Sequence, residues 1–451
     1  MTNWYVDVDS PNYSSTELGT TADPFLGPAG LYNAVNGVGA GGPAAGDTIY
    51  VKGTTGRLDL LAKLTYANGS AAEDWAVGDV VRNYNTGGGS PGDDWVGCVF
   101  KNNPTANVLY VTISHGDTGY YADIANADGV ENVTQSENVA TVTKATCPIE
   151  MFTNIGTVGA RLNIIGCKDD GSWTVDGTRC VLDGNDVVTY CVFTNGTGDY
   201  WTLANFELSQ AATSGLYAGT NKCAACILEN VYAHDCGNIG IDVTYVTPGL
   251  LVRCLAENNV TGGINMYYSA TLIACVALHN TTGYGFRTSG SGTSLSLVDC
   301  LAHGNLDNLT VADIGSVTAV NCVFDGAGRH GVSLTAAGGV FLDACRITNN
   351  GNATNEFGLN MGNAGAYACL RHCMFVGNQG DGDDAAHDIG GVGAANVVQL
   401  DVAASASPNT NILKDNTDPI VDGYVDSSAH DFNIDPETTE LRNVADVLPE
   451  A

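Results

Sequence analysis

A cysteine recurs every 21 to 28 residues through the second half of this chain, and this repeat constrains its fold more than any other feature. Each of these cysteines lies in a similar short segment, with an apolar or small residue three positions before it and another two positions after it. The repeated residues are Cys254, Cys275, Cys300, Cys322, Cys345 and Cys373. Internal periods of this length are typical of solenoid proteins, in which each repeat is one turn of a continuous stack.

An asparagine column accompanies the cysteines. It follows most of them by five positions, at Asn259, Asn280, Asn305, Asn350 and Asn378. Strands stacked about 4.8 Å apart place like residues over like, so cysteine and leucine columns would fill a narrow core while asparagine marks a turn. The interval is too short for a strand–helix–strand unit, which needs about 30 residues. The sequence therefore predicts an all-β chain, a right-handed parallel β-helix solenoid.

The register of the earlier coils is set by similarity of the segments. In this frame Asn230 and Asn205 take the place of the cysteine, and the residue after each cysteine points outward because side chains alternate along a strand. Apolar residues occupy this outward position, at Val231, Leu255, Val276, Leu301 and Val323. Three interpretations remain open: an exposed apolar contact surface, a face covered by a loop of the same chain, or a register that is wrong by one residue.

The chain divides into four predicted parts. Residues 1–64 form an N-terminal cap and first coil, with an amphipathic helix over residues 28–35 that would cover the open sheet edge. Residues 65–146 break the rhythm, and their alternating segments predict a small inserted antiparallel β module. Residues 147–405 form the parallel β-helix, and residues 406–451 form a closing segment.

Charge and the amino terminus limit the partners. The net charge of −32 argues against nucleic acid and anionic lipid, and no apolar run is long enough for membrane insertion. The first residues lack the basic and apolar segments of a secretory signal, so we expect synthesis and retention in a cytoplasm. The 15 cysteines are then expected to be free buried thiols, and Cys223 and Cys226 have no second pair at metal-binding spacing.

Three segments carry a family resemblance. Residues 5–7, residues 46–51 and the ending at residues 430–434 resemble the first and last segments of the right-handed parallel β-helix, pectate-lyase-like superfamily. Together with the coils, the resemblance covers about four-fifths of the chain, and it implies the fold rather than an activity. The inserted module, with Val-Gly-Asp-Val-Val at residues 77–81, resembles small modules in structural proteins of tailed phages and related viruses.

The superfamily includes polysaccharide lyases and hydrolases, and each activity requires particular residue types. A hydrolase needs two carboxylates about 5 to 9.5 Å apart, and a lyase needs a base beside a charge neutraliser such as Ca²⁺. The catalytic candidates are His234, Asp235, Glu257 and His279. Arg253, Arg287, Arg329 and His330 are scattered cations. The alternative is that these are turn residues that hold neighbouring coils together.

One acidic run is a candidate metal site. Asp381, Asp383 and Asp384 carry the oxygen ligands that Ca²⁺ prefers, although such a run also suits a solvated loop. No cofactor is required by the sequence, and Ca²⁺ is the one candidate ion.

The preferred hypothesis is a non-enzymatic structural protein of a tailed phage or virus: a β-helical tail spike, tail fibre or capsid-surface decoration protein. Such a protein is made in the host cytoplasm and located in the virion. It would associate with copies of itself, as a trimer, and with other virion proteins, and would bind host-surface polysaccharide. The alternative is a polysaccharide-degrading tailspike or an extracellular polysaccharide lyase or glycoside hydrolase. A third hypothesis is a carbohydrate-binding adhesin without turnover.

Overall fold

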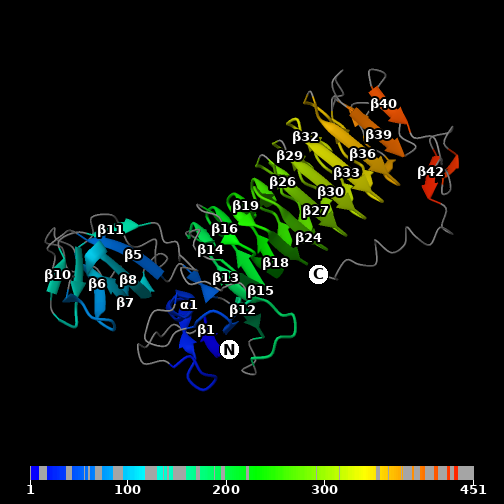
Figure 1. Cartoon of the computed structure of the whole chain (residues 1–451). Coiled ribbons are helices and arrows are strands. Elements are labelled where there is room, and N and C mark those ends of the chain that lie inside the picture. Colours follow the sequence, from blue (N-terminus) through cyan, green and yellow to red (C-terminus); the bar gives the residue numbers. More distant parts are fainter. Residues whose placement is uncertain are drawn as a thin grey trace.

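Three strands per coil build the solenoid in the computed structural model (Figure 1). In the coil that contains Cys275, these are β24 (Ala270–Ile273), β25 (Val276–Leu278) and β26 (Tyr284–Thr288). The first two join one long parallel sheet and the third joins a nine-stranded parallel sheet. The predicted parallel β-helix is confirmed. The structure describes residues 2–9, 18–36, 43–54, 56–58, 61–66, 74–84, 95–116, 129–135, 137–139, 142–145, 159–168, 173–186, 188–194, 199–219, 223–290, 292–313, 315–351, 356–363, 365–376, 378, 389–390, 397–401, 411–414, 424–426 and 431–434.

The long sheet runs the length of the solenoid. Its other strands are β1 (Asn3–Asp7), β2 (Phe25–Leu26), β3 (Thr48–Lys52), β4 (Gly56–Arg57), β12 (Leu162–Cys167), β13 (Cys180–Asp183), β15 (Trp201–Ser209), β18 (Ile227–His234), β21 (Gly249–Val252), β22 (Leu255–Glu257), β27 (Ser294–Val298), β28 (Leu301–His303), β30 (Ser316–Val320), β31 (Val323–Asp325), β33 (Gly339–Asp343), β34 (Arg346–Thr348), β36 (Tyr367–Arg371), β37 (Met374–Val376), β39 (Val397–Asp401) and β40 (Asn411–Lys414).

The nine-stranded sheet lies on the other side of the core. Its other strands are β14 (Tyr190–Thr194), β16 (Ser214–Ala218), β19 (Ile239–Val243), β23 (Gly262–Met266), β29 (Asp307–Val311), β32 (His330–Leu334), β35 (Leu359–Asn360) and β38 (Ile389–Gly390). Two strand pairs stand apart from both sheets: β17 (Cys223–Ala224) with β20 (Val246–Thr247), and β41 (Tyr424–Asp426) with β42 (Asp431–Ile434).

The cysteine column is confirmed as one continuous stack inside the solenoid. Cys254, Cys275, Cys300, Cys322 and Cys345 are each at most 1% exposed. The thiol of Cys275 donates to the carbonyl oxygen of Leu251 in the preceding coil, with 3.5 Å between sulfur and oxygen. The described cysteines are free thiols, as expected, and burial raises the pKa of Cys236 to about 12. The column therefore acts as a small apolar filling for the core.

The predicted register is wrong by one residue in the two earliest coils. Strand pairing places Glu229 beside Val252 and Tyr232 beside Leu255, so Cys254 stacks on Val231 rather than on Asn230. Val231 is fully buried, and Phe206 takes the same inward place one coil earlier. Asn230 instead occupies a left-handed corner with φ of 52°, a conformation that asparagine tolerates well. This corner repeats in later coils at Arg253, Ala274, Asp299, Asn321, Ala344 and His372.

The asparagine ladder is confirmed, with one interruption. The Nδ2 of Asn280 donates to the Oδ1 of Asn305, 2.8 Å away, and Asn280 in turn accepts from Asn259. The coil of Cys322 has Ala327 in the ladder position, and there Asn308 from β29 bridges the gap. Asn308 accepts from Asn305 at 2.9 Å and donates to Asn350 at 3.1 Å. Other coils carry glycine where Asn308 stands, because a Cβ at Gly331 would come within 2.6 Å of the Asn350 amide.

The amino-terminal cap and the inserted module are also confirmed. Helix α1 (Gly27–Asn36) contacts β1 and β2 at the first coil. The module is a seven-stranded antiparallel sheet, and the ring of Tyr32 in α1 lies 5.6 Å from that of Tyr110 in β8. Its elements are β5 (Leu61–Tyr66), β6 (Val80–Tyr84), β7 (Trp95–Asn103), the short helix η3 (Pro104–Ala106), β8 (Val108–Gly116), β9 (Gly129–Asn132), β10 (Glu137–Val139) and β11 (Val142–Ala145). The boundaries of the four predicted parts stay predictions.

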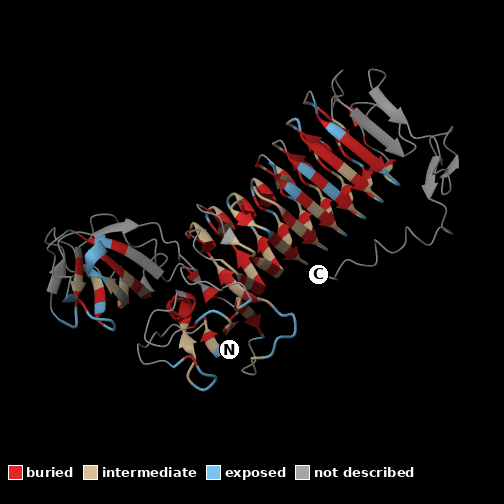
Figure 2. Cartoon of the chain, in the orientation of Figure 1, coloured by how far each residue is buried: buried red, intermediate tan, exposed pale blue. Residues whose placement is uncertain are grey.

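Burial separates the two sheets (Figure 2). Strands of the long sheet alternate between buried and partly exposed residues, as in β24 and β25, because only their inner side meets the core. Strands β19, β23, β29 and β32 are buried at every position. No helix among these described elements has the length and apolar character needed to cross a bilayer.

Candidate functional site

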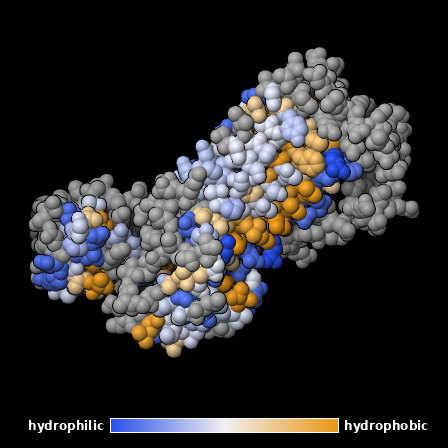
Figure 3. Space-filling view, viewed as in Figure 1, coloured by the Kyte–Doolittle hydropathy of each residue, from blue (hydrophilic) through white to orange (hydrophobic). Residues whose placement is uncertain are grey.

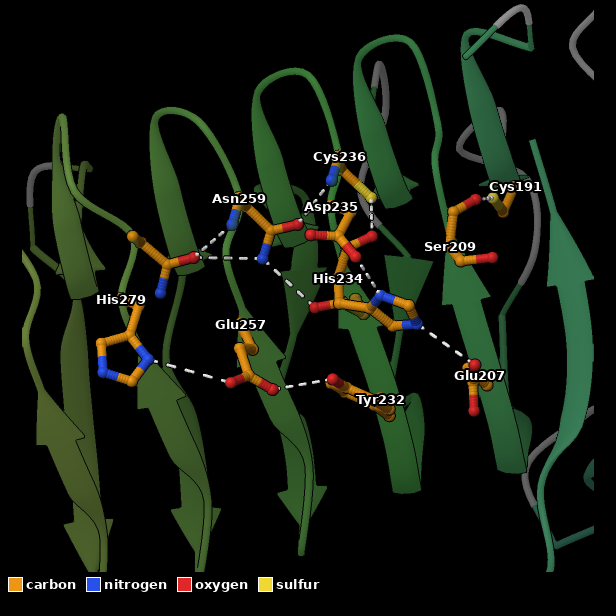
Figure 4. Close-up of polar contacts among 12 residues, drawn as sticks. Cys191, Glu207, Ser209, Tyr232, His234, Asp235, Cys236, Glu257, Asn259 and His279 are labelled. Atoms are coloured by element: carbon orange, nitrogen blue, oxygen red, sulfur yellow. Dashed lines mark hydrogen bonds and ion pairs between the residues drawn. The ribbon is translucent and has the colours of Figure 1, made fainter. Parts of the chain in front are cut away.

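The four predicted catalytic residues converge on the outer side of the long sheet (Figure 4). His234 ends β18, and Glu257 lies beside it at the end of β22. Asp235 follows β18 and His279 follows β25, both at left-handed corners. The Nδ1 of His234 lies 2.7 Å from the Oδ2 of Asp235, and the Nδ1 of His279 lies 3.8 Å from the Oε1 of Glu257. The fold therefore brings the four predicted residues together on three successive coils.

Three further residues complete this cluster and were missed. Glu207 of β15 lies 3.2 Å from the Nε2 of His234, and the hydroxyl of Tyr232 donates to Glu257 over 2.7 Å. The guanidinium of Arg179 lies 5.2 Å from the centre of the Tyr232 ring. Glu207 pairs with Tyr232 in the strand register, one coil before it.

The charges in the cluster satisfy one another. Burial alone would lower the pKa of His234, but its hydrogen bonds to Glu207 and Asp235 raise it above the usual value. The hydrogen bond from His234 lowers the pKa of Glu207. Burial, together with the hydrogen bond to Glu257, raises the pKa of Tyr232. Because each group is engaged by a neighbour, the contacts suit the alternative role of holding coils together; a catalytic role for these residues stays a prediction.

The calcium candidates Asp381, Asp383 and Asp384 lie outside the described residues. Within the described part of the chain, no group of three or more histidine, cysteine, aspartate or glutamate side chains is placed to hold a metal ion. A calcium site therefore stays a prediction.

A second polar set lies on the outer side of the nine-stranded sheet. Alternation puts Ile241, Ile264 and Phe286 in the core and the residue after each of them outside. These outer residues form one row across adjacent strands: Tyr217, Asp242, Asn265, Arg287, Thr310, Ser333 and Asn360. Asp242 is 8% exposed, Asn265 6% and Ser333 1%, so the row is polar but largely buried. We call it the outer polar row.

Asp242 is the acidic group of the outer polar row. Its Oδ1 accepts from the hydroxyl of Thr244 and from the Nδ2 of Asn265, which is 3.1 Å away. Burial raises its pKa, although these two hydrogen bonds and the charge of Arg287 act in the opposite direction. Burial therefore disfavours the charged form of Asp242, while its hydrogen-bond partners and Arg287 favour it.

Arg287 and Tyr284 lie side by side in the next strand, β26. The guanidinium carbon of Arg287 is 5.1 Å from the centre of the Tyr284 ring, and burial raises the pKa of Tyr284 to about 12. The Nε of Arg287, the Oδ1 of Asn265 and the Oγ of Ser333 are buried without a protein partner in the described part of the chain. Buried polar atoms normally have partners, so these three are polar groups that the described side chains of the row leave unsatisfied.

An ion pair and an imidazole lie further along the same sheet, at the starts of strands β29 and β32. The Nε of Arg329 donates to the Oδ1 of Asp307 over 2.8 Å, and this interaction raises the pKa of Arg329. Burial lowers the pKa of His330, whose Nδ1 accepts from the backbone N–H of Phe357 at 3.1 Å. His330 is therefore biased toward its neutral form.

Stacked aromatic rings lie at the start of the same sheet. The rings of Tyr190 and Tyr217 are 4.8 Å apart and inclined by 19°, and Phe193 lies 5.4 Å from Tyr190. Tyr190 and Tyr217 are partly exposed. Flat aromatic faces beside a few placed polar groups are typical of small-molecule and carbohydrate sites.

The outer polar row was not predicted as a unit. Arg287, Arg329 and His330 were expected as scattered cations, and the fold gathers them on one sheet. A signal was present: the strand that follows each repeated glycine reads Ile-Asp, Ile-Asn, Phe-Arg and Val-Ser in four coils, with a polar residue always second. Its identity changes from coil to coil, which hides it from a search for repeated residues.

Comparisons with known proteins agree with this architecture. A family model for the right-handed β-helix region matches residues 156–310. A solved rhamnogalacturonan lyase shares 12% identity with this chain at a TM-score of 0.50, over 94% of this chain and 88% of that one. The pectate lyase Pel9A shares 13% identity at a TM-score of 0.49, over 97% and 90% of the two chains.

A search of curated proteins finds no match to the chain. At these sequence identities the solved structures are evidence for the fold alone. The matched segment, the stacked parallel coils and the likeness to the rhamnogalacturonan lyase show that this chain has the right-handed parallel β-helix fold of pectate-lyase-like proteins.

Proposed function

We propose that the chain binds a polysaccharide along the outer polar row of the nine-stranded sheet. The observation that carries the proposal is that the partly exposed Arg287 and Asn360 share one row with the partly exposed Tyr217, whose ring stacks on that of Tyr190. Sugar hydroxyl groups can both donate to and accept from polar side chains, and the stacked Tyr190 and Tyr217 offer flat surfaces for sugar rings. The similar solved structure is named as a rhamnogalacturonan lyase, which favours a polysaccharide over other ligands.

The same row has groups suited to cleaving a glycosidic bond. In this proposal Asp242, whose pKa is raised by burial, would protonate a leaving oxygen, and Arg287 would stabilise negative charge nearby. Hydrolysis and elimination would both produce new reducing ends, and elimination alone would also produce an unsaturated sugar that absorbs ultraviolet light. Incubation with a panel of plant, algal and bacterial polysaccharides distinguishes both outcomes from binding without turnover.

Binding can be tested with two matched arginine variants. We expect Arg287→Gln to weaken polysaccharide binding at least tenfold, because it removes a charged donor from the row. Arg253→Gln is the control, since Arg253 is a strongly exposed residue of the long sheet that pairs with Glu229. Isothermal titration calorimetry against the best polysaccharide of the panel measures both variants. Equal affinities for the two variants, or no binding partner in the panel, would contradict the proposal.

A structural role in a virion is the second candidate function. It is favoured by the inserted antiparallel module and by the apolar residues exposed along the solenoid. In this proposal the chain associates with copies of itself and with virion proteins in the host cytoplasm, without contacts to nucleic acid or insertion into a membrane. Electron microscopy of particles from a strain lacking the chain tests it: unchanged particles would argue against a virion location and favour an extracellular enzyme or adhesin.

A further inference from the structure

The two sheets of the solenoid present different outer surfaces. Apolar surface gathers over the long sheet (Figure 3), where Val231 is buried but the other predicted outward residues are partly exposed: Leu255, Val276, Leu301 and Val323. The nine-stranded sheet instead carries partly exposed tyrosines beside the outer polar row. We call them the tyrosine patch, and its members are Tyr190, Tyr217, Tyr245, Tyr267 and Tyr268.

The rings of the tyrosine patch lie on four successive coils. The ring of Tyr245, which follows β19, lies 5.8 Å from that of Tyr267, which follows β23, and the two are inclined by 19°. Tyr268 lies 5.1 Å from Tyr267, edge to face. The backbone N–H of Tyr245 donates over 3.0 Å to the carbonyl oxygen of Ala218, directly after Tyr217. This group of three rings therefore adjoins the stacked pair at Tyr190 and Tyr217.

Two glycines make room for these rings. A Cβ at Gly219 would come within 2.8 Å of the Tyr217 ring, and a Cβ at Gly290 would come within 2.7 Å of the Tyr267 ring. Both rings therefore rest close against the backbone, Tyr267 against that of the next coil. Part of each ring stays accessible to solvent, as stacking with a ligand requires.

Few basic side chains accompany the tyrosine patch. From residue 181 to residue 286 the sequence contains two lysine or arginine residues, Lys222 and Arg253. Lys222 lies outside the described residues, and Arg253 pairs with Glu229 on the long sheet. A polyuronate carries a carboxylate on every sugar, so a surface that holds it needs cations repeated along its length. The outer polar row supplies one, Arg287.

Asp242 adds negative charge beside the tyrosine patch. It is aligned with Tyr217 in the strand register. Burial, followed by the charge of Asp242, raises the pKa of both Tyr190 and Tyr217. Their hydroxyl groups therefore remain protonated and can donate hydrogen bonds. An anionic ligand would be repelled here by ionised Asp242 and by the net charge of −32.

We propose that the ligand of the nine-stranded sheet is an uncharged polysaccharide, whose sugar rings stack on the tyrosine patch and whose hydroxyl groups contact the outer polar row. This inference rests on the proposed polysaccharide binding and narrows it to one chemical class. The apolar face of a sugar ring packs on an aromatic ring without a counter-charge, and tyrosine hydroxyl groups can bond to its hydroxyl groups. A coil spacing of about 4.8 Å lets a chain that runs along the solenoid place successive sugars over successive coils.

The charge preference is tested with the tightest binder from the polysaccharide panel, by calorimetry with the full chain. We expect this binder to be uncharged, with an affinity that changes little between low and high salt. Carboxymethylation of the polysaccharide should weaken binding at least tenfold. Hydroxyethylation to the same degree adds similar bulk without charge, and should weaken binding less than threefold. An anionic polysaccharide as the tightest binder would overturn this inference and leave the proposed function standing, whereas no binder in the panel would overturn both.

Stacking is tested with three tyrosine variants. Tyr267→Ala should weaken binding of the uncharged polysaccharide about tenfold, and Tyr267→Phe, which keeps the ring, should stay within threefold of the wild type. Tyr50→Ala is the matched control, because Tyr50 is a partly exposed residue of the long sheet that stacks on Tyr5 at 5.4 Å, also inclined by 19°. Circular dichroism of each variant confirms that the solenoid remains folded. Equal affinities of Tyr267→Ala and Tyr50→Ala would refute the tyrosine patch as the binding surface.

Discussion

The buried cysteine and asparagine columns and the outer polar row follow opposite rules. In the two columns the same residue type recurs in successive coils, as with Cys275 and Cys300 or Asn280 and Asn305. In the outer polar row each coil contributes a different residue, including Asp242, Asn265 and Arg287. Identical side chains stack well on themselves in a parallel stack, whereas a ligand requires different groups at different places. Repetition therefore marks the residues that stabilise the fold, and its loss marks the residues available for function.

Removing one rung of the ladder gives the largest expected effect. The buried amide of Asn280 donates to Ala256 and Asn305 and accepts from Asn259. Asn280→Ala leaves these buried groups without partners and should lower the free energy of unfolding by about 3–5 kcal/mol. Urea denaturation measures the change. Thr281→Ala, at the exposed neighbouring position, should change it by less than about 0.5 kcal/mol. Similar losses of unfolding free energy for the two variants would show that the asparagine column does not stabilise the fold more than an exposed neighbouring residue does.

The interruption of the ladder sharpens the comparison. Asn308→Gly restores the glycine found in other coils but removes the bridge between Asn305 and Asn350, and should cost about 2 kcal/mol. Adding Ala327→Asn should return the missing rung and recover most of that loss. Ala327→Asn alone should destabilise the protein, because its side chain competes with Asn308 for one space. Additive effects in this double-mutant cycle would show that the two positions do not compensate.

A variant in the outer polar row should show the reverse behaviour. Asp242→Asn keeps the size of the side chain, so stability at neutral pH should change by less than about 1 kcal/mol. Burial raises the pKa of Asp242 in the folded state above its usual value of 3.8. The wild type therefore loses stability as pH rises from 3.8 through the folded pKa, and the variant does not. Polysaccharide binding should fall about tenfold, or about 1.4 kcal/mol. Thermal unfolding from pH 3 to 8 together with calorimetry checks both parts; a large stability loss with intact binding would contradict them.

The smallest expected effect concerns His234. Its pKa is raised in the folded state, so its contribution is fully present below the unfolded value of about 6.5 and disappears as pH rises through the folded value. The pKa of Glu207 is lowered, so its contribution disappears at acidic pH. His234→Gln should therefore cost about 1 kcal/mol near pH 5.5 and less at pH 9. A pH-independent difference in melting temperature would show that the imidazolium contributes no charge-dependent stability.

The success and the error in the predicted register have the same origin. From Cys254 onward the repeated thiol fixes which residues point inward, and strand pairing confirms that part of the frame. In the earlier coils Val231 and Phe206 replace cysteine. The sequence pattern instead aligned the neighbouring Asn205 and Asn230 with the cysteines, because asparagine is a more distinctive residue than valine or phenylalanine. A core position accepts any apolar residue of suitable size, while a left-handed corner favours asparagine. Aligning the asparagines with the cysteines therefore gave a register that is wrong by one residue.

The candidate sites were predicted to different degrees. His234 and His279 were found because each lies four positions after the Cys/Asn column of the predicted frame, with Asp235 and Glu257 close to the same place, whereas Glu207 follows Asn205 by two positions and was missed. The outer polar row could not be found in this way, because its members share only a position. Their polarity alone would have placed them at the surface, but Asp242 and Ser333 are buried.

The sequence by itself determined the all-β solenoid, its cap helix and the two columns of its core, because stacking at a fixed interval demands recurring residues. Only the tertiary structure decided which polar residues became buried neighbours on the nine-stranded sheet, and which apolar residues lie on the outer side of the long sheet. Those outcomes depend on where coils of unequal length place each residue along the axis. The exact bend of each loop sets that placement, and loop sequences contain no repeat from which to derive it.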